Sequence, residues 1–442
     1  MLNPRRWIVA LAAATSLLIA AHANAEFPLK DGDIWVMAGD SITAQHLHSN
    51  YFEAFCYARY PKLKFGFRNS GVGGHTIPST LDRFDYDIAA WKPTVVSVEL
   101  GMNDQGGTPT DKFAANMGKM IERIRGIKAR PVILSASPIN SGSTMASLGG
   151  NKRLHEYADA LKELSAKENI PYADQFHALI DVWGKNKPNE ILLTGLGQVK
   201  NLAGNDKLEG VEHLRAFLAA HEKNKGKLVS MGGDPVHPGA PGQLMMAAAL
   251  LKALGADPFV SSAVINVGAK TIDAKGCVVE ALTVKDGNVA FDRLDERLPF
   301  PIPDDTRAVL AIDPTILDMS QYTLKVTGLK AGNYELKVEG GSLGTVTAAE
   351  LEAGVNLTSF GPGLKGANPI AAQSKAILAA VSARAALVGQ WRSLSAGVTR
   401  NKGPADGPAQ LAALTKRVEE ADEQIRVAAR PRKMHYELSV QP

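Results

Sequence analysis

The fold is decided by the stretch Ile34-Trp35-Val36-Met37-Ala38-Gly39-Asp40-Ser41-Ile42-Thr43, in which an apolar run gives way to a polar turn. An uncharged apolar run of this kind predicts a strand that is buried on both faces of a sheet. Gly39 and the small polar residues after it predict a turn that leads into a helix. We therefore expect Ser41 to lie at the carboxyl end of the strand with its hydroxyl exposed.

The same alternation continues to about residue 257. Further buried strands are predicted at residues 63–68, 94–100, 131–136 and 170–174. Helices are predicted over residues 51–60, 112–128, 152–168 and 242–254. Apolar strands that alternate with amphipathic helices indicate an α/β domain whose parallel sheet is covered on both faces. In such sheets, ligands bind beyond the carboxyl ends of the strands.

The pattern changes after Pro258. Short β-like runs recur between glycine-containing turns, at residues 277–282, 322–326 and 334–338. This spacing predicts hairpins in a small antiparallel β region over residues 258–362. Between residues 183 and 231 the pattern is looser, with one helical stretch over residues 208–223 that either covers a cleft or is a solvated insertion.

The last region, residues 363–442, predicts a helical hairpin. Its two helices cover residues 371–394 and 409–429, and a Gly- and Pro-rich turn joins them. The region holds 12 Lys and Arg against 6 Asp and Glu. This basic tail either contacts an acidic glycan or lipid head groups, or it presents an ordinary solvated helix face.

The first residues have the pattern of a secretory signal peptide. Met1 to Arg6 is basic, Trp7 to Ala20 is apolar, and Ala23-Asn24-Ala25 places small residues before a cleavage point at Glu26. The alternative, a retained membrane anchor, requires a longer apolar run. We predict a signal peptide over residues 1–25, a secreted or periplasmic mature protein, and no other membrane-spanning window.

Composition excludes several classes of protein. The chain has 442 residues, of which 45% are hydrophobic and 21% charged, which is enough apolar material for two or three domains. The formal net charge is +4 and falls to +2 without Arg5 and Arg6, too little for a nucleic-acid partner that relies on phosphate neutralisation. Two cysteines, Cys56 and Cys277, exclude a disulfide scaffold, and whether these two are bonded stays open.

Four separated blocks carry residues suited to catalysis. The first is Gly39 to Thr43, where Ser41 can act as a nucleophile or can simply cap a helix. The second is Asn-Ser-Gly-Val-Gly-Gly-His-Thr at residues 69–76, whose glycines can aim backbone N–H groups at a ligand or form a tight loop.

The remaining two blocks supply an amide and an imidazole. Asn103, in residues 101–104, offers a side-chain donor at the same sheet edge, although Asn is also common in turns. In residues 234–238, Asp234 precedes His237 by three residues and can fix its tautomer. A capped turn or half of a metal site would explain the same pair, but no metal-binding motif accompanies it.

These four blocks, in this order, resemble the SGNH (GDSL-type) hydrolase superfamily over about residues 34–254. The resemblance implies a flavodoxin-like three-layer α/β/α domain over residues 26–257. It implies that Ser41 is the nucleophile, that His237 is the base and that Asp234 orients it. It further implies that Gly74 and Asn103 join the Ser41 backbone amide as oxyanion-hole donors. Ile42 replaces the Leu that is common in the family, and both residues are apolar.

The resemblance implies a secreted serine esterase that needs no cofactor and no metal. The expected substrate is a carboxylic, most simply an acetyl, ester on a carbohydrate. The alternatives are a lipase or short-chain lipid-ester hydrolase, and a catalytically dead carbohydrate-binding protein. His46 and His48 are expected at a cleft rim or on the surface, and His75 is either a loop residue or a substrate contact. The sequence makes no prediction of the oligomeric state.

Overall fold

The structure is a computed structural model. It describes residues 27–139, 151–186, 200–207, 211, 215, 218–219, 222, 233–311, 313, 315–362 and 368–441. The predicted signal peptide and most of the predicted helical stretch over residues 208–223 lie outside the described residues.

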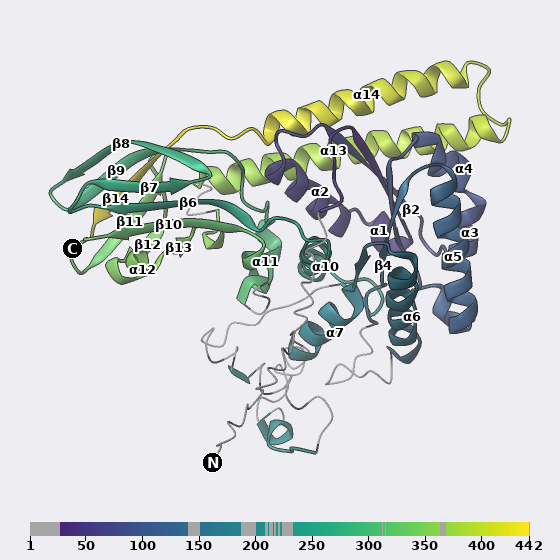
Figure 1. The fold of residues 1–442 in the computed structure, drawn as a ribbon, viewed down its shortest axis with the longest axis horizontal. Coiled ribbons are helices and arrows are strands. Elements are labelled where there is room, and N and C mark those ends of the chain that lie inside the picture. Colours follow the sequence, from purple (N-terminus) through teal and green to yellow (C-terminus); the bar gives the residue numbers. More distant parts are fainter. Residues whose placement is uncertain are drawn as a thin grey trace, which may run out of the picture.

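The first part of the chain forms a five-stranded parallel sheet (Figure 1). Its strands are β1 (Asp33–Gly39), β2 (Phe65–Gly71), β3 (Val95–Glu99), β4 (Arg130–Leu134) and β5 (Tyr172–Ala173). They lie in the order β2-β1-β3-β4-β5, which is the flavodoxin-like order. Gly39 pairs with Gly71 on one side and with Glu99 on the other, so the first three strands end at one level. The predicted α/β fold is confirmed.

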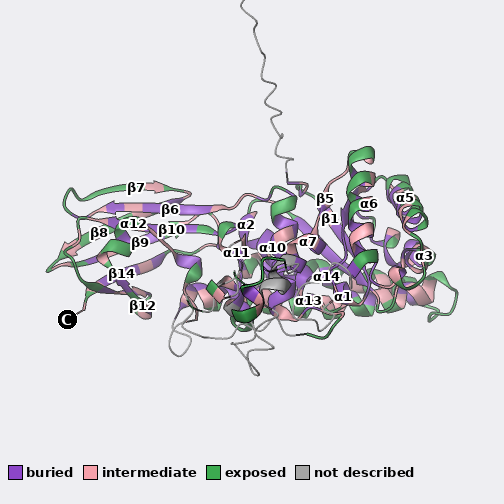
Figure 2. Cartoon of the chain, turned by 90° about the horizontal axis from the view of Figure 1, so that it is seen from below, coloured by how far each residue is buried: buried purple, intermediate pink, exposed green. Residues whose placement is uncertain are grey.

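Helices cover both faces of this sheet. They are α1 (Ser41–Ala44), α2 (His48–Arg59), α3 (Ile77–Asp82), α4 (Phe84–Asp87), α5 (Thr110–Gly126), α6 (Lys152–Glu168), α7 (Gln175–Asn186) and α10 (Ala240–Ala253). Helix α5 shows why apolar periodicity predicted these helices. Four of its apolar residues recur at helical spacing and are all buried, namely Phe113, Met117, Met120 and Ile124. Figure 2 shows the same division, with buried residues in β1 and exposed residues on the outer side of α5 and α6.

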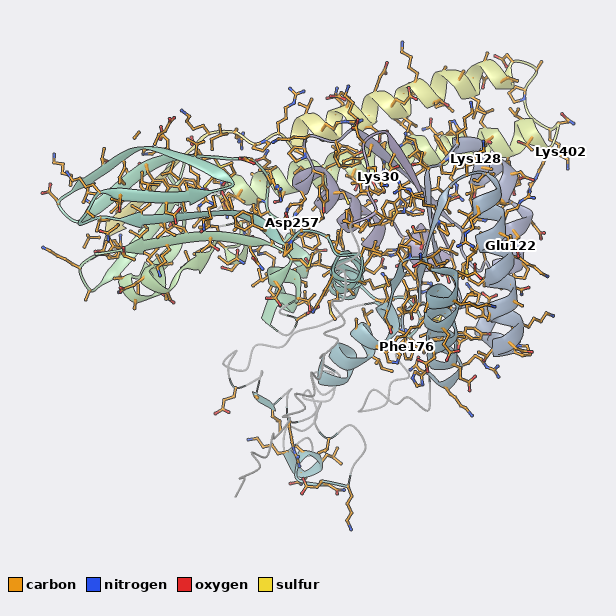
Figure 3. The ribbon with its side chains drawn as sticks, viewed as in Figure 1. Lys30, Glu122, Lys128, Phe176, Asp257 and Lys402 are labelled. Carbon is orange, nitrogen blue, oxygen red and sulfur yellow. The ribbon has the colours of Figure 1, made fainter. Side chains whose placement is uncertain are left out.

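A β-rich part follows Asp257, which Figure 3 labels at the junction. One sheet has the order β13-β10-β6-β7 and a second has the order β12-β11-β14-β9-β8. The strands are β6 (Phe259–Asn266), β7 (Thr271–Lys275), β8 (Cys277–Lys285), β9 (Asn288–Asp295), β10 (Gln321–Thr327), β11 (Asn333–Val338), β12 (Gly341–Thr347), β13 (Val355–Asn356) and β14 (Met434–Val440). Short helices α11 (Thr315–Asp318) and α12 (Ala348–Ala353) lie between strands.

Two features of this part differ from the sequence-based expectation. Strands β6 and β10 pair in parallel, so the region is not purely antiparallel. A hairpin turn cannot join parallel strands, and here β7, β8, β9 and the connection through α11 separate them along the chain. Strand β14 was not predicted, and it brings the end of the helical region back into the second sheet between β11 and β9. The domain boundaries themselves stay predictions.

The two long helices, α13 (Pro369–Thr399) and α14 (Gly407–Ala428), run side by side along the α/β domain (Figure 1). Arg384 of α13 pairs with the buried Glu53 of α2 and, at 3.1 Å, with Asp422 of α14. Asp422 also binds Arg68 of β2 at 2.8 Å. Because these groups are nearly inaccessible, part of the positive charge of the tail neutralises internal carboxylates instead of facing solvent.

Helix α13 is, in the described part of the chain, the one helix long and apolar enough to cross a membrane by length and composition. The sequence analysis had found no such window after the signal peptide. In the structure the large apolar residues on one side of α13 pack against protein, whereas several alanines on the helix are exposed. Trp391 stacks on Trp91 with ring centroids 3.5 Å apart, and Ile377, Val381 and Val388 belong to the main hydrophobic core.

The open question about the cysteines is settled by their environments. Cys56 is buried in α2 and Cys277 is buried at the start of β8, and both are free thiols. Burial raises the pKa of each thiol, so neither is activated as a nucleophile.

Candidate active site

Ser41 is the first residue of α1, directly after β1. The preceding residue, Asp40, caps this helix, since its side chain accepts a hydrogen bond of 2.9 Å from the backbone N–H of Ile42. Ser41 itself is therefore not the cap, and its hydroxyl remains available. The turn places Ser41 at the carboxyl edge of the sheet, as the sequence predicted for a serine in this position.

His237 meets Ser41 from the opposite end of the domain. The Nε2 atom of His237 lies 2.7 Å from Oγ of Ser41, although 196 positions separate them in the sequence. Its other ring nitrogen, Nδ1, lies 2.8 Å from Oδ2 of Asp234. The structure thus brings a hydroxyl, an imidazole and a carboxylate into one line of hydrogen bonds, in the arrangement of a nucleophile, a base and an orienting acid.

The loop that carries His237 is held by its own backbone. The backbone N–H groups of Val236 and His237 each donate to Oδ1 of Asp234 at 2.8 Å. These hydrogen bonds, followed by the bond to the His237 ring, lower the pKa of Asp234 to about 2. Asp234 is therefore ionised at any physiological pH, which suits a carboxylate that orients an imidazole.

Two residues that sequence reasoning missed support this loop. Gly233 has a φ of +86°, and a Cβ there would lie 2.1 Å from the carbonyl oxygen of His237, so a side chain would displace the loop. Gln243 is completely buried on α10. Its amide N–H groups donate to Gln45 and, at 3.0 Å, to the carbonyl of Pro238, while its oxygen accepts from the N–H of His48. Gln243 therefore ties the loop of His237 to the segment that follows Ser41.

The glycine block and Asn103 complete the arrangement around Ser41. A Cβ on Gly73 would lie 3.8 Å from the Cβ of Ser41, so this loop passes beside the serine. Gly74 follows with a φ of +76°, a left-handed conformation that favours glycine. The side-chain amide of Asn103 donates to the carbonyl of His75 at 3.1 Å and to Asp40 at 3.3 Å. Asn103 thus joins the second block to the first.

Three buried carboxyl groups have pKa values that shift upward, opposite to the downward shift of Asp234. Burial raises the pKa of Asp40 and of Asp104 to about 6 in each case. Burial, together with repulsion from Asp40, raises the pKa of Glu99 well above its usual range. Glu99 accepts a hydrogen bond of 2.9 Å from the hydroxyl of Thr43, in the nucleophile block. Burial thus favours the neutral forms of these three carboxyl groups, whereas hydrogen bonds favour the charged form of Asp234.

The other histidines of the sequence analysis differ in position. The prediction for His48 was wrong, because its side chain is buried and hydrogen-bonds to Gln243 instead of lying at a rim or on the surface. Burial lowers the pKa of His48 to about 4, so it is neutral. His46 is half-buried and lines a surface pocket between α2 and α13. His75 accepts a hydrogen bond of 3.2 Å from Arg83, which occupies its Nδ1 atom.

Comparisons with known proteins show similarity to esterases over part of the chain. Residues 37–191 match the GDSL-like lipase/acylhydrolase family. The chain is 25% identical to the uncharacterized lipoprotein YqeF of Bacillus subtilis over 147 residues, which is 28% of this chain and 60% of that protein. It is 23% identical to an acetylxylan esterase of Geobacillus stearothermophilus over 141 residues, which is 30% of this chain and 64% of that protein. The chain therefore spans less than two thirds of each of these relatives.

A solved structure extends the likeness to the whole fold. The structure of a gut microbial diltiazem-metabolizing enzyme matches with a TM-score of 0.69 at 22% identity, over 94% of this chain and all of that one. The shared fold thus includes the β-rich part and the long helices. Over residues 37–191, the part that carries Ser41, the chain is similar to the GDSL-like lipase/acylhydrolase family.

Proposed function

We propose that this chain is a serine esterase in which Ser41 attacks the carbonyl carbon of a carboxylic ester. The observation that carries the proposal is the 2.7 Å contact between Oγ of Ser41 and Nε2 of His237, with Asp234 on the far side of the imidazole. A serine hydroxyl is a weak nucleophile until a base takes its proton, and His237 is in position to take it.

The reaction proceeds in two halves. His237 takes the proton of the Ser41 hydroxyl while Oγ forms a bond to the carbonyl carbon, and the carbonyl oxygen becomes an oxyanion. The imidazolium then gives that proton to the leaving alcohol, and the C–O bond of the ester breaks to leave an acyl-serine. Water repeats the sequence: His237 takes one proton, the hydroxide oxygen attacks the acyl carbon, and Ser41 regains its proton as the acid leaves.

Three donors are proposed for the oxyanion, namely the backbone N–H groups of Ser41 and Gly74 and the side-chain amide of Asn103. The position of the glycine block beside Ser41 supports this assignment, as does the amide of Asn103 between the first and second blocks. Burial holds Glu99 toward its neutral form, which reduces the repulsion that a nearby carboxylate would exert on the developing negative charge.

For the substrate we propose an acetyl ester on a carbohydrate. One of the relatives is named an acetylxylan esterase, and it is 23% identical to this chain over 141 residues. We also infer that the mature protein is exported, on the pattern of basic, apolar and small residues at positions 1–25. A mass measurement on the exported chain tests the latter, with Glu26 as the expected first residue.

Hydrolysis of p-nitrophenyl acetate by the purified chain tests the esterase proposal. We expect Ser41→Ala to reduce the rate by roughly four to six orders of magnitude. Ser393→Ala removes an exposed serine of α13 and serves as the matched control, with an unchanged rate. Equal rates for wild type and Ser41→Ala, with both folded by circular dichroism, would overturn the proposal.

A substrate panel then tests the preference for acetylated carbohydrate. Acetylated xylooligosaccharides are compared with p-nitrophenyl esters of increasing acyl length and with lipid esters. The proposal requires the highest kcat/KM on the acetylated sugars. A preference for long acyl chains would favour the lipase reading, and binding of the sugars without hydrolysis would favour the dead carbohydrate-binding protein.

A further inference from the structure

A second cluster of potential ligands lies away from Ser41, where α6 meets α7. His155 and Asp159 are one helical turn apart on α6, and His177 lies in the first turn of α7. One ligand atom from each of the three residues lies within 4.8 Å of the other two. Residues four positions apart on a helix share a face, which explains how α6 presents both of its groups to His177.

The ring of His177 is oriented by the carboxylate of Asp174. Its Nδ1 atom lies 2.8 Å from Oδ2 of Asp174, and its backbone N–H donates to Oδ1 of the same carboxylate at 2.9 Å. The contact with Asp174 occupies Nδ1 and leaves Nε2 as the coordinating atom. Histidine ligands of metals ordinarily make this kind of hydrogen bond with their second nitrogen, which fixes the tautomer and raises the basicity of the first.

His155 is positioned by aromatic packing. Its ring lies 5.9 Å from that of Phe176 and nearly parallel to it, and 5.0 Å from the ring of His177 at an angle of 80°. Phe176 is fully buried at the beginning of α7, beside α6 (Figure 3). Two imidazoles that bind one tetrahedral ion at about 2.1 Å have ring centres about 5 Å apart, so the observed spacing already suits a shared ion.

The ligand atoms need to move only a short distance to bind one ion. Ligand atoms around a tetrahedral Zn²⁺ ion are about 3.4 Å apart. Nε2 of His155 and Oδ2 of Asp159 already lie 3.5 Å apart. The side chains of His155, His177 and Asp159 are 36%, 41% and 57% exposed, so they can rotate without repacking the core and an ion can enter from solvent.

We propose that His155, Asp159 and His177 bind a divalent transition-metal ion, for which Zn²⁺ is the best fit, with Asp174 orienting His177 from the outer shell. Two imidazoles with one carboxylate suit Zn²⁺ better than Mg²⁺ or Ca²⁺, which prefer oxygen ligands throughout. Water completes the coordination on the exposed side. The ion joins α6 to α7 and thereby stabilises this end of the domain.

The proposed site is separate from the reacting ester. Asp174 follows β5, the outer strand of the sheet, whereas Ser41 follows β1. Strands β3 and β4 lie between them, which corresponds to about 14 Å at the usual strand spacing. The ion is therefore structural and makes no contact with the acyl group. Zn²⁺ binding by Ser41→Ala is expected to equal that of the wild type, so the two proposals can fail independently.

Titration of the chelator-treated full chain with Zn²⁺ by calorimetry tests the site. We expect one ion per chain and a rise in Tm on binding. His155→Gln and His177→Gln each remove one ligand of the ion. Loss of an outer-shell partner weakens metal binding by about 10- to 100-fold, and we expect each of these two variants to weaken Zn²⁺ binding by more than that. Tetrahedral Co²⁺ has a characteristic visible spectrum, which supplies a second readout that should disappear in both variants.

His435→Gln is the matched control. His435 lies in the β-rich part with Asp292 at 2.7 Å and Glu437 at 3.4 Å, so it places one imidazole beside two carboxylates. Among the described residues it belongs to no group of three potential ligands like that of His155. Its replacement should leave the affinity, the Tm rise and the Co²⁺ spectrum unchanged. No Zn²⁺ uptake by the wild type, unchanged binding in His155→Gln and His177→Gln, or a loss confined to His435→Gln would each overturn the proposal.

Discussion

Two Asp-x-x-His turns in this chain have the same local geometry and different surroundings. In both turns the carboxylate contacts Nδ1 of the histidine at 2.8 Å, for Asp234 with His237 and for Asp174 with His177. In both, the second carboxylate oxygen accepts the backbone N–H of that histidine, at 2.8 Å and 2.9 Å. The turns differ in the group beside the ring. The hydroxyl of Ser41 lies 2.7 Å from Nε2 of His237, whereas the ring of His155 lies 5.0 Å from the ring of His177.

The comparison separates orientation from chemistry. The Asp-x-x-His turn fixes the tautomer and direction of a ring, and it does so equally well in both places. A hydroxyl in front of the ring makes the turn part of a proton relay, whereas a second imidazole and a carboxylate make it part of a metal site. The same spacing in a sequence therefore predicts an oriented histidine, and its neighbours decide the function.

After Ser41→Ala, the largest effect is expected from Asp234→Asn, which breaks the first turn. The variant can hold His237 in the wrong tautomer, so kcat on p-nitrophenyl acetate should fall by about 10³- to 10⁴-fold. Asp85→Asn removes an exposed carboxylate that pairs with Arg123 and should leave kcat unchanged. If Asp234→Asn retained wild-type kcat, Asp234 would have no part in orienting the base.

Asn103→Ala should have the next largest effect. Loss of one oxyanion donor typically lowers kcat by about 10²- to 10³-fold, since the donor acts mainly on the transition state. The KM should change little, so the ratio of the two parameters distinguishes this role from substrate binding. A variant with raised KM and normal kcat would reassign Asn103 to holding the ester in the ground state.

Asp174→Asn makes the corresponding change in the second turn. We expect about 10- to 100-fold weaker Zn²⁺ binding, because Asp174 orients a ligand and is not one itself. Asp174→Asn and Asp234→Asn make the same chemical change in the two turns. We expect the first to lower the affinity for Zn²⁺ and the second to lower the rate of ester hydrolysis. Unaltered Zn²⁺ affinity would show that His177 needs no orienting carboxylate.

The smallest effect on catalysis is expected from Glu99→Gln. Burial raises the pKa of the Glu99 carboxyl well above its usual range, which favours the neutral form. A neutral amide of the same shape should therefore change kcat by less than about threefold. Stability should respond to pH instead. The folded wild type holds a proton that the unfolded chain releases above its usual pKa of 4.5, so the free energy of unfolding falls as the pH rises through the folded pKa.

Urea unfolding at about pH 5 and about pH 8 measures this difference. The decrease in the free energy of unfolding between the two should be smaller in Glu99→Gln than in the wild type. A variant with strongly reduced kcat would mean that Glu99 acts as an anion, like Asp234, and that the contrast between charged and neutral carboxyl groups in the site does not hold.

Much of the α/β domain could be predicted from the sequence because its signals are local. Apolar runs and helical periodicity place its strands and helices to within a few residues, and the polar block around Ser41 follows one of those strands directly. Parallel strands in the order found here bring their carboxyl ends to one edge, which is why blocks far apart in the sequence could be expected to converge.

The residues that escaped prediction depend on tertiary packing. Gln243 lies within an apolar helix pattern, and only the fold shows that it bridges the His237 loop and the residues after Ser41. His155 and His177 lie on different helices and meet through the packing of Phe176. One signal was available, since residues 174–177 repeat the spacing that drew attention to residues 234–237.

Strand β14 lies at the centre of the second sheet, although it is the last strand of the chain. Hairpins β8–β9 and β11–β12 form from neighbouring residues, but only residues 434–440 join them. The α/β sheet can close before residues 434–440 have paired, because its last strand ends at residue 173. Until residues 434–440 pair, the hairpins β8–β9 and β11–β12 each keep an edge strand with unpaired backbone groups. Such edges can pair with strands of other chains, so this folding intermediate is prone to misassembly.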